Sequence, residues 1–530
     1  MMTRTQQELL GLLKRVAAFL DENGITFYLF GGTAIGALRH RGFIPWDDDI
    51  DILMDRDNYY RLMEVSSSLP DDIEYNCFEL DHNFAKPYGM FCNRTDTATS
   101  RSRMYWGGIC MGTAIDVFLT DEVPEDRLDE YVKDLFLYQE TMVDAWLYKT
   151  DIAKYSDEYF ELMKRRQQIG KPALMEELKG RLDRYTYEES DRRVVRVSGG
   201  SPVRKYMKEW IGEPVYCDFE GLRMPLQTMP EACLRMQYGY NWYMIPEPDD
   251  QTHHVQIQNY DVSYNNYYKD LSRFIDWDEA NEVNRKQKLA DIGRLDSWLA
   301  VEDFSTEMKA NAVLMCADLE EKEGGILAAF EQGNYGEVLD CLSELTANVR
   351  LFIKTGCGKG EISPDILSVW IESLIRSGRY WDARKVRMAF CGGYFGDAAL
   401  GYALDLLDKV LLMAEHWQDH KPEDCRDALM LLPEEIRDQI PDCIVAEAWL
   451  MEQGKVAADG ERLLAACSSY LKLFPDNYDI MKVKADLLIA GGETEAGEEL
   501  YRRVQDCSRN GLDLLYIGDY FSGKMGNSIL

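Results

Sequence analysis

Four aspartates stand within five residues near the start of the chain, in the run 47–51 (DDDID). The alternation of aspartate with isoleucine in this run predicts a strand over about 48–54. Because side chains alternate along a strand, we expect Asp47, Asp49 and Asp51 on one face and Asp48 on the other. Any fold for this chain therefore has to hold three carboxylates side by side.

Three crowded carboxylates repel one another, and this repulsion raises their pKa values unless a cation compensates it. Oxygen ligands of this kind suit Mg²⁺ or Mn²⁺, so the run predicts a metal site. A solvated acidic loop is the alternative interpretation. A further carboxylate, Asp116, lies inside the apolar strand predicted over 113–119, and we expect it to complete the site. For Asp116 the alternative is a structural aspartate paired with an arginine.

The segment Gly31-Gly32-Thr33 lies between a predicted strand over 25–30 and a short predicted helix over 34–39. Backbone amides at such a turn approach phosphate oxygens closely, and the start of a helix favours negative charge. We therefore interpret this turn as a phosphate-binding turn, with Arg39 as a further phosphate contact. Ordinary surface solvation is the alternative for Arg39.

The whole chain has 530 residues, which predicts more than one domain. Its formal net charge of -34 argues against binding to nucleic acid. No stretch of about 18 uninterrupted apolar residues occurs, so no membrane span is predicted. Thirteen cysteines without any CxxC pair predict free thiols rather than a disulfide framework or a zinc site, and thus a cytoplasmic protein.

The pattern of the chain changes after about residue 285. Helical stretches separated by turns such as Gly333-Asn334-Tyr335, Gly378-Arg379-Tyr380 and Gly491-Gly492-Glu493 predict an all-α, TPR-like solenoid over 285–530. A helical bundle without repeats is the alternative. Residues 1–275 are predicted to form one catalytic domain, with a helical insert over about 122–200.

Several ordered segments within residues 10–260 resemble the LicD family. These segments are 30–51 (FGGTAIGALRHRGFIPWDDDID), 115–118 (IDVF), 219–225 (FEGLRMP), 238–240 (YGY), Pro246 and His253-His254. The resemblance implies an α+β chain whose first domain has a nucleotidyltransferase (polymerase-beta-like) fold with a mixed sheet. It does not extend to the helical half.

The resemblance also implies roles for individual residues. It places Asp49, Asp51 and Asp116 as metal ligands and catalytic residues, and Gly31, Gly32 and Thr33 as the donor-phosphate turn with Arg39 beside it. Asp47 and Asp48 match the same motif and are expected near the substrate. His253 and His254 are candidates for orienting a phosphate or the acceptor, and a structural histidine is the alternative for each.

The activity that the resemblance implies is the metal-dependent transfer of a phospho-alcohol group, such as phosphocholine. The donor would be a CDP-activated alcohol such as CDP-choline, and the acceptor a hydroxyl of a glycan or glycan precursor in cell-surface polysaccharide biosynthesis. One alternative is nucleotidyl transfer from an NTP to a small hydroxyl acceptor, because fold does not determine reaction. Another is a non-catalytic interaction protein, in which the helical repeats bind a protein partner or a second copy of the chain.

Overall fold

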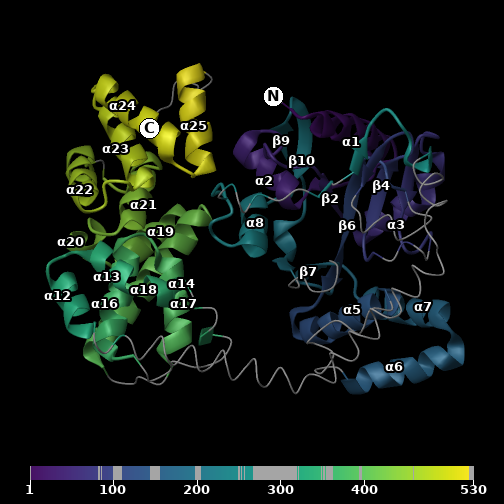
Figure 1. Cartoon of the computed structure of the whole chain (residues 1–530), viewed down its shortest axis with the longest axis horizontal. Coiled ribbons are helices and arrows are strands. Elements are labelled where there is room, and N and C mark those ends of the chain that lie inside the picture. Colours follow the sequence, from purple (N-terminus) through teal and green to yellow (C-terminus); the bar gives the residue numbers. More distant parts are fainter. Residues whose placement is uncertain are drawn as a thin grey trace. The chain divides into compact units, whose positions relative to one another are not determined.

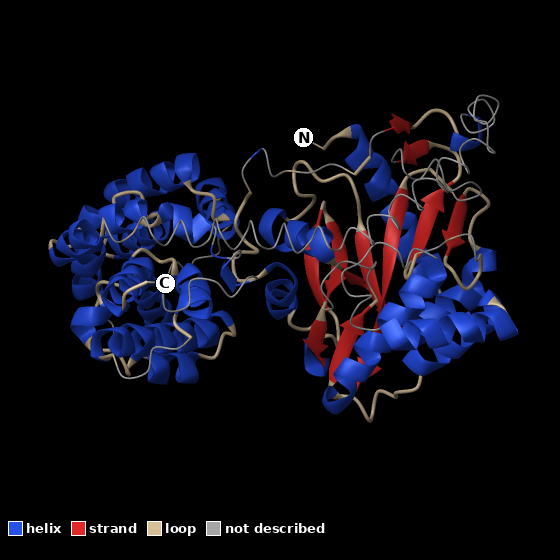
Figure 2. Cartoon of the chain, turned by 60° about the horizontal axis from the view of Figure 1, so that its bottom comes forward, coloured by secondary structure: helices blue, strands red, loops and turns tan. Residues whose placement is uncertain are grey.

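The computed structural model describes most of the chain in two separate units, Met1–Leu295 and Asp296–Leu530. The described residues are 2–81, 84, 86–99, 110–143, 156–196, 204–246, 248, 251, 254–255, 257–266, 319, 322–347, 349, 352–353, 362–392, 397–457 and 459–523. The first unit contains a mixed sheet with helices, and the described part of the second is helical (Figure 2). The α+β class is therefore confirmed. The predicted domain ends at 275 and 285 lie outside the described residues.

The first unit is built around one seven-stranded sheet with two small two-stranded sheets beside it. The helices of this unit are α1 (Arg4–Glu22), α2 (Gly31–His40), α3 (Arg56–Val65), α5 (Leu128–Val143), α6 (Ser156–Ile169), α7 (Lys171–Leu182) and α8 (Pro230–Tyr238). Its strands are β1 (Tyr28–Leu29), β2 (Asp51–Asp55), β3 (Ile73–Asn76), β4 (Gly89–Asn93), β5 (Thr97–Thr99), β6 (Ala114–Val123), β7 (Arg192–Val195), β8 (Lys205–Met207), β9 (Val215–Phe219), β10 (Leu222–Leu226) and β11 (Ile257–Asn259). Short 3-10 helices lie at Ser66–Ser68, Glu125–Arg127 and Lys208–Trp210.

The main sheet has the order β1-β2-β6-β4-β3, with β7 on β6 and β8 on β7. Strands β2 and β6 run parallel, and the other pairs are antiparallel. Ile52, Leu53 and Met54 of β2 are all fully buried, as expected for a central strand that is covered on both faces. The sheet therefore holds β2 and β6 rigidly in the middle of the unit.

The predicted helical insert over 122–200 is only partly correct. Helices α5, α6 and α7 lie together at one end of the unit (Figure 1). However, β6 continues to Val123, and residues 192–195 form strand β7, which pairs with β6. The charged residues of this segment suggested a solvent-exposed helix and hid the strand pattern. In the structure Arg196, which follows β7, is buried instead, and its Nε donates a 2.5 Å hydrogen bond to Asp121 of β6.

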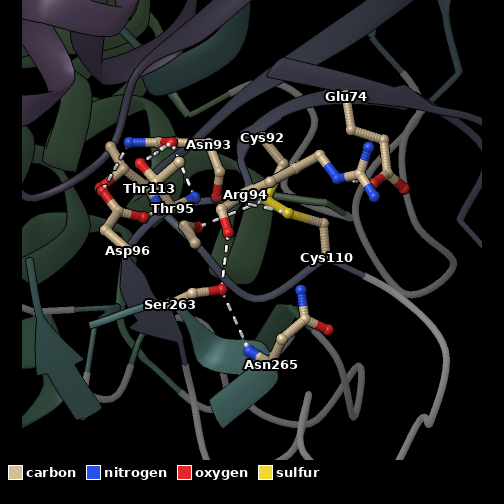
Figure 3. Close-up of a disulfide and its surroundings, with 11 residues drawn as sticks. Glu74, Cys92, Asn93, Arg94, Thr95, Asp96, Cys110, Thr113, Ser263 and Asn265 are labelled. Atoms are coloured by element: carbon tan, nitrogen blue, oxygen red, sulfur yellow. Dashed lines mark hydrogen bonds and ion pairs between the residues drawn. A yellow bond between two sulfur atoms is a disulfide. The ribbon is translucent and has the colours of Figure 1, made fainter. Parts of the chain in front are cut away.

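The prediction that the cysteines are all free thiols is wrong for one pair. Cys92, in β4, forms a disulfide with Cys110, which lies shortly before β6 (Figure 3). Beside this bond, the buried Asp96 carboxylate accepts hydrogen bonds from the backbone N–H and the hydroxyl of Thr113. Spacing alone did not reveal the pair, because the two cysteines are 18 residues apart and meet only when β4 pairs with β6. The cytoplasmic location was predicted from free thiols, and disulfides are uncommon in a reducing cytoplasm. The cytoplasmic location therefore stays a prediction.

The second unit consists of short helices joined by tight turns in its described part. Its helices are α12 (Glu323–Glu331), α13 (Tyr335–Cys341), α14 (Ser343–Ala347), α16 (Pro364–Arg376), α17 (Tyr380–Phe390), α18 (Ala398–Gln418), α19 (Pro422–Leu429), α20 (Glu434–Arg437), α21 (Pro441–Glu452), α22 (Gly460–Leu473), α23 (Tyr478–Ala490), α24 (Thr494–Cys507) and α25 (Gly511–Ser522). The predicted turns at 333–335, 378–380 and 491–493 each separate two of these helices. Within the described residues of the whole chain, no helix has the length and apolar character needed to cross a membrane.

Candidate functional site

The pairing of β2 with β6 brings two of the predicted site residues together. Asp51 is the first residue of β2 and lies directly opposite Asp116 of β6 in the parallel register. The Asp116 N–H donates a 3.0 Å hydrogen bond to the carbonyl of Ile50, which fixes this register at its start. Two carboxylates that are 65 residues apart in the sequence (116 minus 51) thus become neighbours on adjacent strands.

The predicted strand over 48–54 begins later than expected, because β2 starts only at Asp51. Asp47 and Asp49 lie in the preceding loop, where their carboxyl groups share a hydrogen bond. Asp48 points elsewhere, since its carboxylate accepts hydrogen bonds of 2.9 Å from the backbone N–H groups of His254 and Val255. The expected grouping of Asp47, Asp49 and Asp51 is therefore present, but strand alternation is the wrong reason for it.

Burial and mutual repulsion make these carboxylates hard to ionise. Burial, reinforced by the charges of Asp49 and Asp116, raises the pKa of Asp51 well above its usual range, while Arg204 opposes this effect. Burial and Asp49 raise the pKa of Asp47 to about 8. Burial also raises the pKa of Asp49, although the nearby His254 lowers it. Such a cluster is stable at neutral pH only as a partly protonated site or with a bound cation.

The Gly31-Gly32 turn lies directly against this cluster. Gly31 has a φ of 58°, and a Cβ added there would lie 2.7 Å from Asp51 Oδ2. A Cβ added to Gly32 would lie 3.2 Å from Asp47 Oδ2. Glycines thus leave open the space in front of two carboxylates at the start of helix α2, where backbone amides favour anions.

The other two residues of the predicted phosphate site have structural contacts. The hydroxyl of Thr33 accepts a 2.9 Å hydrogen bond from the backbone N–H of Asp51, so Thr33 positions the start of β2. Arg39 is buried, and its guanidinium donates to the carbonyls of Trp242 and Met244. Burial lowers the pKa of Arg39 to about 10, against the opposing charge of Asp47. Both residues therefore support the site through hydrogen bonds with backbone groups.

One of the two candidate histidines borders the cluster. His254 Nε2 lies 3.6 Å from Asp49 Oδ2, and its side chain is mostly exposed. His253 lies outside the described residues. The structure thus places His254 at the rim of the acidic cluster, where its side chain can reach both Asp49 and solvent.

Three further side chains lie beside the cluster, and the sequence analysis did not assign them to the site. Lys86 Nζ lies 3.8 Å from Asp116 Oδ2, and Arg204 lies near enough to lower the pKa of Asp51. The hydroxyl of Tyr238, the last residue of α8, would lie 3.4 Å from a Cβ added to Gly31. The only sequence signal for Lys86 is its place between the aromatic residues Phe84 and Tyr88, and such a signal is weak.

A buried glutamine positions the loop that carries Asp47. Gln6 of α1 is 2% exposed, and its Nε2 atom donates to the carbonyls of Ile44, Pro45 and Asp47 at 3.0 to 3.3 Å. The helix begins with a capping box in which the Gln6 side chain also accepts from the Thr3 N–H. The N-terminal helix therefore belongs to the structural support of the acidic cluster.

The donor set fits a hard divalent cation that is completed by a ligand. Among the described residues, no three His, Cys, Asp or Glu side chains are arranged to hold a metal ion together. Mg²⁺, however, is usually bound through one or two carboxylates together with water and substrate phosphates. Asp49 and Asp51 provide oxygen donors beside an open turn that suits phosphate. This chemistry is compatible with Mg²⁺ or Mn²⁺ bound together with a phosphorylated ligand.

Comparison with known proteins supports the resemblance noted in the sequence. Residues 24–175 match the family model described as LicD/FKTN/FKRP, nucleotidyltransferase domain. The lipopolysaccharide cholinephosphotransferase LicD of Haemophilus influenzae is 27% identical over 273 residues, which cover 48% of this chain and 97% of that protein. An uncharacterized protein of Rickettsia prowazekii is 37% identical over 54 residues, or 10% of this chain and 20% of its own length. The resemblance to the LicD family is confirmed.

Proposed function

Residues 24–175 carry a LicD-family domain, and from this premise we propose that the chain transfers a phospho-alcohol group, such as phosphocholine, to a hydroxyl of a glycan or glycan precursor. The proposed donor is a CDP-activated alcohol such as CDP-choline. The observation that carries the proposal is the cluster of Asp47, Asp49, Asp51 and Asp116 against the Gly31-Gly32 turn. The similarity to a cholinephosphotransferase supports it. We also propose that the first unit has a nucleotidyltransferase fold.

Asp49 and Asp51 would hold Mg²⁺ or Mn²⁺ together with water and the phosphates of the donor. A metal ion there supplies positive charge that stabilises the diphosphate as its bridging bond breaks. The open turn at Gly31 and Gly32 lets backbone amides approach a phosphate oxygen. The chain thus contributes mainly positioning and electrostatics, which dominate catalysis of phosphoryl transfer.

The reaction balances without a further reagent. The acceptor hydroxyl oxygen forms a bond to the phosphorus that carries the alcohol, and the bond from this phosphorus to the CMP oxygen breaks. CMP leaves with the electron pair of that bond. We propose that the Asp116 carboxylate takes the hydroxyl proton, since it lies opposite Asp51.

Release of CMP tests this proposal. The purified chain is incubated with CDP-choline, Mg²⁺ and a glycan fraction, and CMP is measured; parallel reactions with CTP or ATP are measured for pyrophosphate. We expect CMP release in wild type and its loss in Asp49→Asn and Asp51→Asn. Asp57→Asn is the matched control, because Asp57 is an exposed residue in the first turn of α3 and does not belong to the cluster. Near-native turnover in both Asp49→Asn and Asp51→Asn would contradict the assignment, and pyrophosphate without CMP would favour nucleotidyl transfer.

For the second unit we propose a TPR-like solenoid that binds a protein partner or a second copy of the chain. Helix pairs joined by short turns, such as α16 with α17 and α23 with α24, support this architecture. Gly378 and Gly492 have positive φ angles of 78° and 90° in these turns, which allows the sharp reversal between helices. Size-exclusion chromatography coupled to light scattering would separate self-association from a monomer.

A further inference from the structure

Two basic side chains lie beside the acidic cluster, Lys86 next to Asp116 of β6 and Arg204 next to Phe30, which is bonded to Asp51 of β2. Lys86 precedes β4, which adjoins β6, and its Nζ lies 3.8 Å from Asp116 Oδ2. Arg204 precedes β8, and its guanidinium carbon lies 5.6 Å from the centre of the Phe30 ring; the backbone N–H of Phe30 donates a 2.9 Å hydrogen bond to the carbonyl of Asp51. Because Asp51 and Asp116 are directly opposite each other, a ligand lying across this pair would have Lys86 near its Asp116 side and Arg204 near its Asp51 side.

A row of aromatic rings supports both cations. Phe118 lies two residues after Asp116 and therefore on the same face of β6. Its ring is 5.2 Å from that of Phe30 and 4.7 Å from that of Tyr88, measured between centroids. Lys86 Nζ lies 4.6 Å from the centre of the Tyr88 ring, and the Arg204 guanidinium carbon lies 5.6 Å from that of Phe30. These cation–π contacts hold each cation beside the carboxylates. They are weak enough that a contact with a bound phosphate can replace them.

Both cations lie where a ligand can reach them. The side chain of Lys86 is 14% exposed and that of Asp116 is 24% exposed, so each keeps part of its surface in contact with solvent. Arg204 is half-buried. The ion pair between Lys86 and Asp116, at 3.8 Å, is near the upper limit for such contacts, which leaves room for a shorter contact to a phosphate oxygen.

A negatively charged diphosphate needs these cations. Four aspartates surround the place where the donor would lie, and one divalent ion does not neutralise both the carboxylates and the diphosphate. Arg39, the predicted phosphate contact, is buried and donates to the carbonyls of Trp242 and Met244. Lys86 and Arg204 lie beside the cluster and are partly exposed instead.

We propose that Lys86 and Arg204 form a two-cation clamp that binds the diphosphate of the donor across the Asp51–Asp116 pair. This inference rests on the proposed function for the identity of the donor. It extends that function by assigning the phosphate contacts to two residues outside the acidic run. The clamp recognises phosphate oxygens and leaves the alcohol group to other parts of the site.

The test measures equilibrium binding by calorimetry, with Mg²⁺ present and no acceptor. The probes are CDP-choline, CTP and inorganic pyrophosphate. The variants are Lys86→Met, Arg204→Met and Lys86→Arg, which keeps the charge. Lys208→Met is the matched control, because Lys208 also lies over a tyrosine ring, at 3.5 Å from the centre of Tyr187, but away from the cluster.

We expect Lys86→Met and Arg204→Met each to weaken the binding of phosphate-bearing probes by about ten- to a hundredfold, as for loss of a charge-assisted hydrogen bond. Lys86→Arg and Lys208→Met should bind within about threefold of wild type, a change of less than 1 kcal/mol. Thermal unfolding of each variant shows whether it is folded. If Lys86→Met does not fold, the affinities of Lys86→Arg and Lys86→Gln for the probes are compared instead, since only the first keeps the positive charge.

The outcomes separate the clamp from the proposed function. Wild-type affinity for CDP-choline in both Lys86→Met and Arg204→Met would overturn the clamp and leave the function standing. Binding of CTP or pyrophosphate but not CDP-choline, with the expected losses in both variants, would support the clamp and contradict the proposed donor. Failure of the wild type to bind any of the three probes would overturn both.

Discussion

The close approach of Gly31 to Asp51 leads to a quantitative prediction. Replacement of Gly31 by alanine has two separable effects. The φ of 58° is a left-handed conformation that costs an L-residue about 1–2 kcal/mol. In addition, the new Cβ would lie 2.7 Å from Asp51 Oδ2, closer than side-chain atoms approach one another, so the carboxylate or the turn has to move.

Two further glycines separate these effects. Gly24 has a nearly identical φ of 62°, and a Cβ there would meet nothing closer than Arg61, at 3.6 Å. Gly24→Ala therefore carries the backbone strain without contact to the site. Gly32→Ala carries the contact without left-handed strain, since its Cβ would lie 3.2 Å from Asp47 Oδ2.

The two measurements are urea denaturation and the release of CMP from CDP-choline. Gly31→Ala and Gly24→Ala should each lower the free energy of unfolding by about 1–2 kcal/mol. Only Gly31→Ala should reduce turnover by about a hundredfold, because a displacement of about 1 Å in a catalytic constellation costs this much. Gly32→Ala should lie between wild type and Gly31→Ala. If Gly31→Ala keeps turnover within about twofold of Gly24→Ala, the contact with Asp51 has no role and the reasoning fails.

Three other predictions follow from the same structure. Because the pKa of Asp47 is about 8 in the folded chain and 3.8 is its ordinary value, its contribution to stability is present below pH 4 and is lost as the pH rises to 8. Denaturation in EDTA should show this loss, and Mg²⁺ should reduce it. Asp47→Asn should make the loss smaller, while Asp49 and Asp51, whose pKa values are also raised, keep part of it; an equal slope in that variant would contradict the assignment. Gln6→Leu should lower the free energy of unfolding by about 1–3 kcal/mol, because buried carbonyls lose their donor. In the control, replacement of the exposed Gln7 by leucine should change it by less than about 0.5 kcal/mol. Equal effects of the two substitutions would show that the Gln6 contacts are unimportant. Reduction of the Cys92–Cys110 bond, which closes a separation of 18 residues, should lower the free energy of unfolding by about 3 kcal/mol. A Cys92→Ser variant should be insensitive to reductant, and a wild-type stability that reductant leaves unchanged would show that the bond does not form.

Local patterns predicted the elements of the first unit more accurately than their ends. The short helix predicted over 34–39 is found as α2, which begins three residues earlier, at Gly31, and ends at His40. The strand predicted over 25–30 is shorter in the structure, at Tyr28–Leu29, because β1 pairs only with a short part of β2. Apolar content indicated a strand there, but the length of a strand depends on the partner that it meets.

The acidic residues of the site could be predicted, but their basic counterparts could not. Aspartates in a run, or one aspartate in an apolar strand, are unusual enough to be noticed in the sequence alone. Lys86 and Arg204 lie in loops among many other charged residues of an acidic chain. Their relevance comes from the order β2-β6-β4 in the sheet and from the aromatic row that supports them, and both are tertiary features.

The loop that carries Asp47 and Asp49 shows why a motif does not contain its own geometry. The loop is not a strand, so no local rule turns these two carboxylates toward Asp51. Gln6 binds the loop carbonyls from helix α1, and the backbone of residues 254–255 binds Asp48, which directs that side chain away from its neighbours. Both anchors are distant in sequence from the acidic run. A substitution at either anchor therefore changes the arrangement of the carboxylates while every residue of the run is intact, and intact motif residues alone do not establish a functional site.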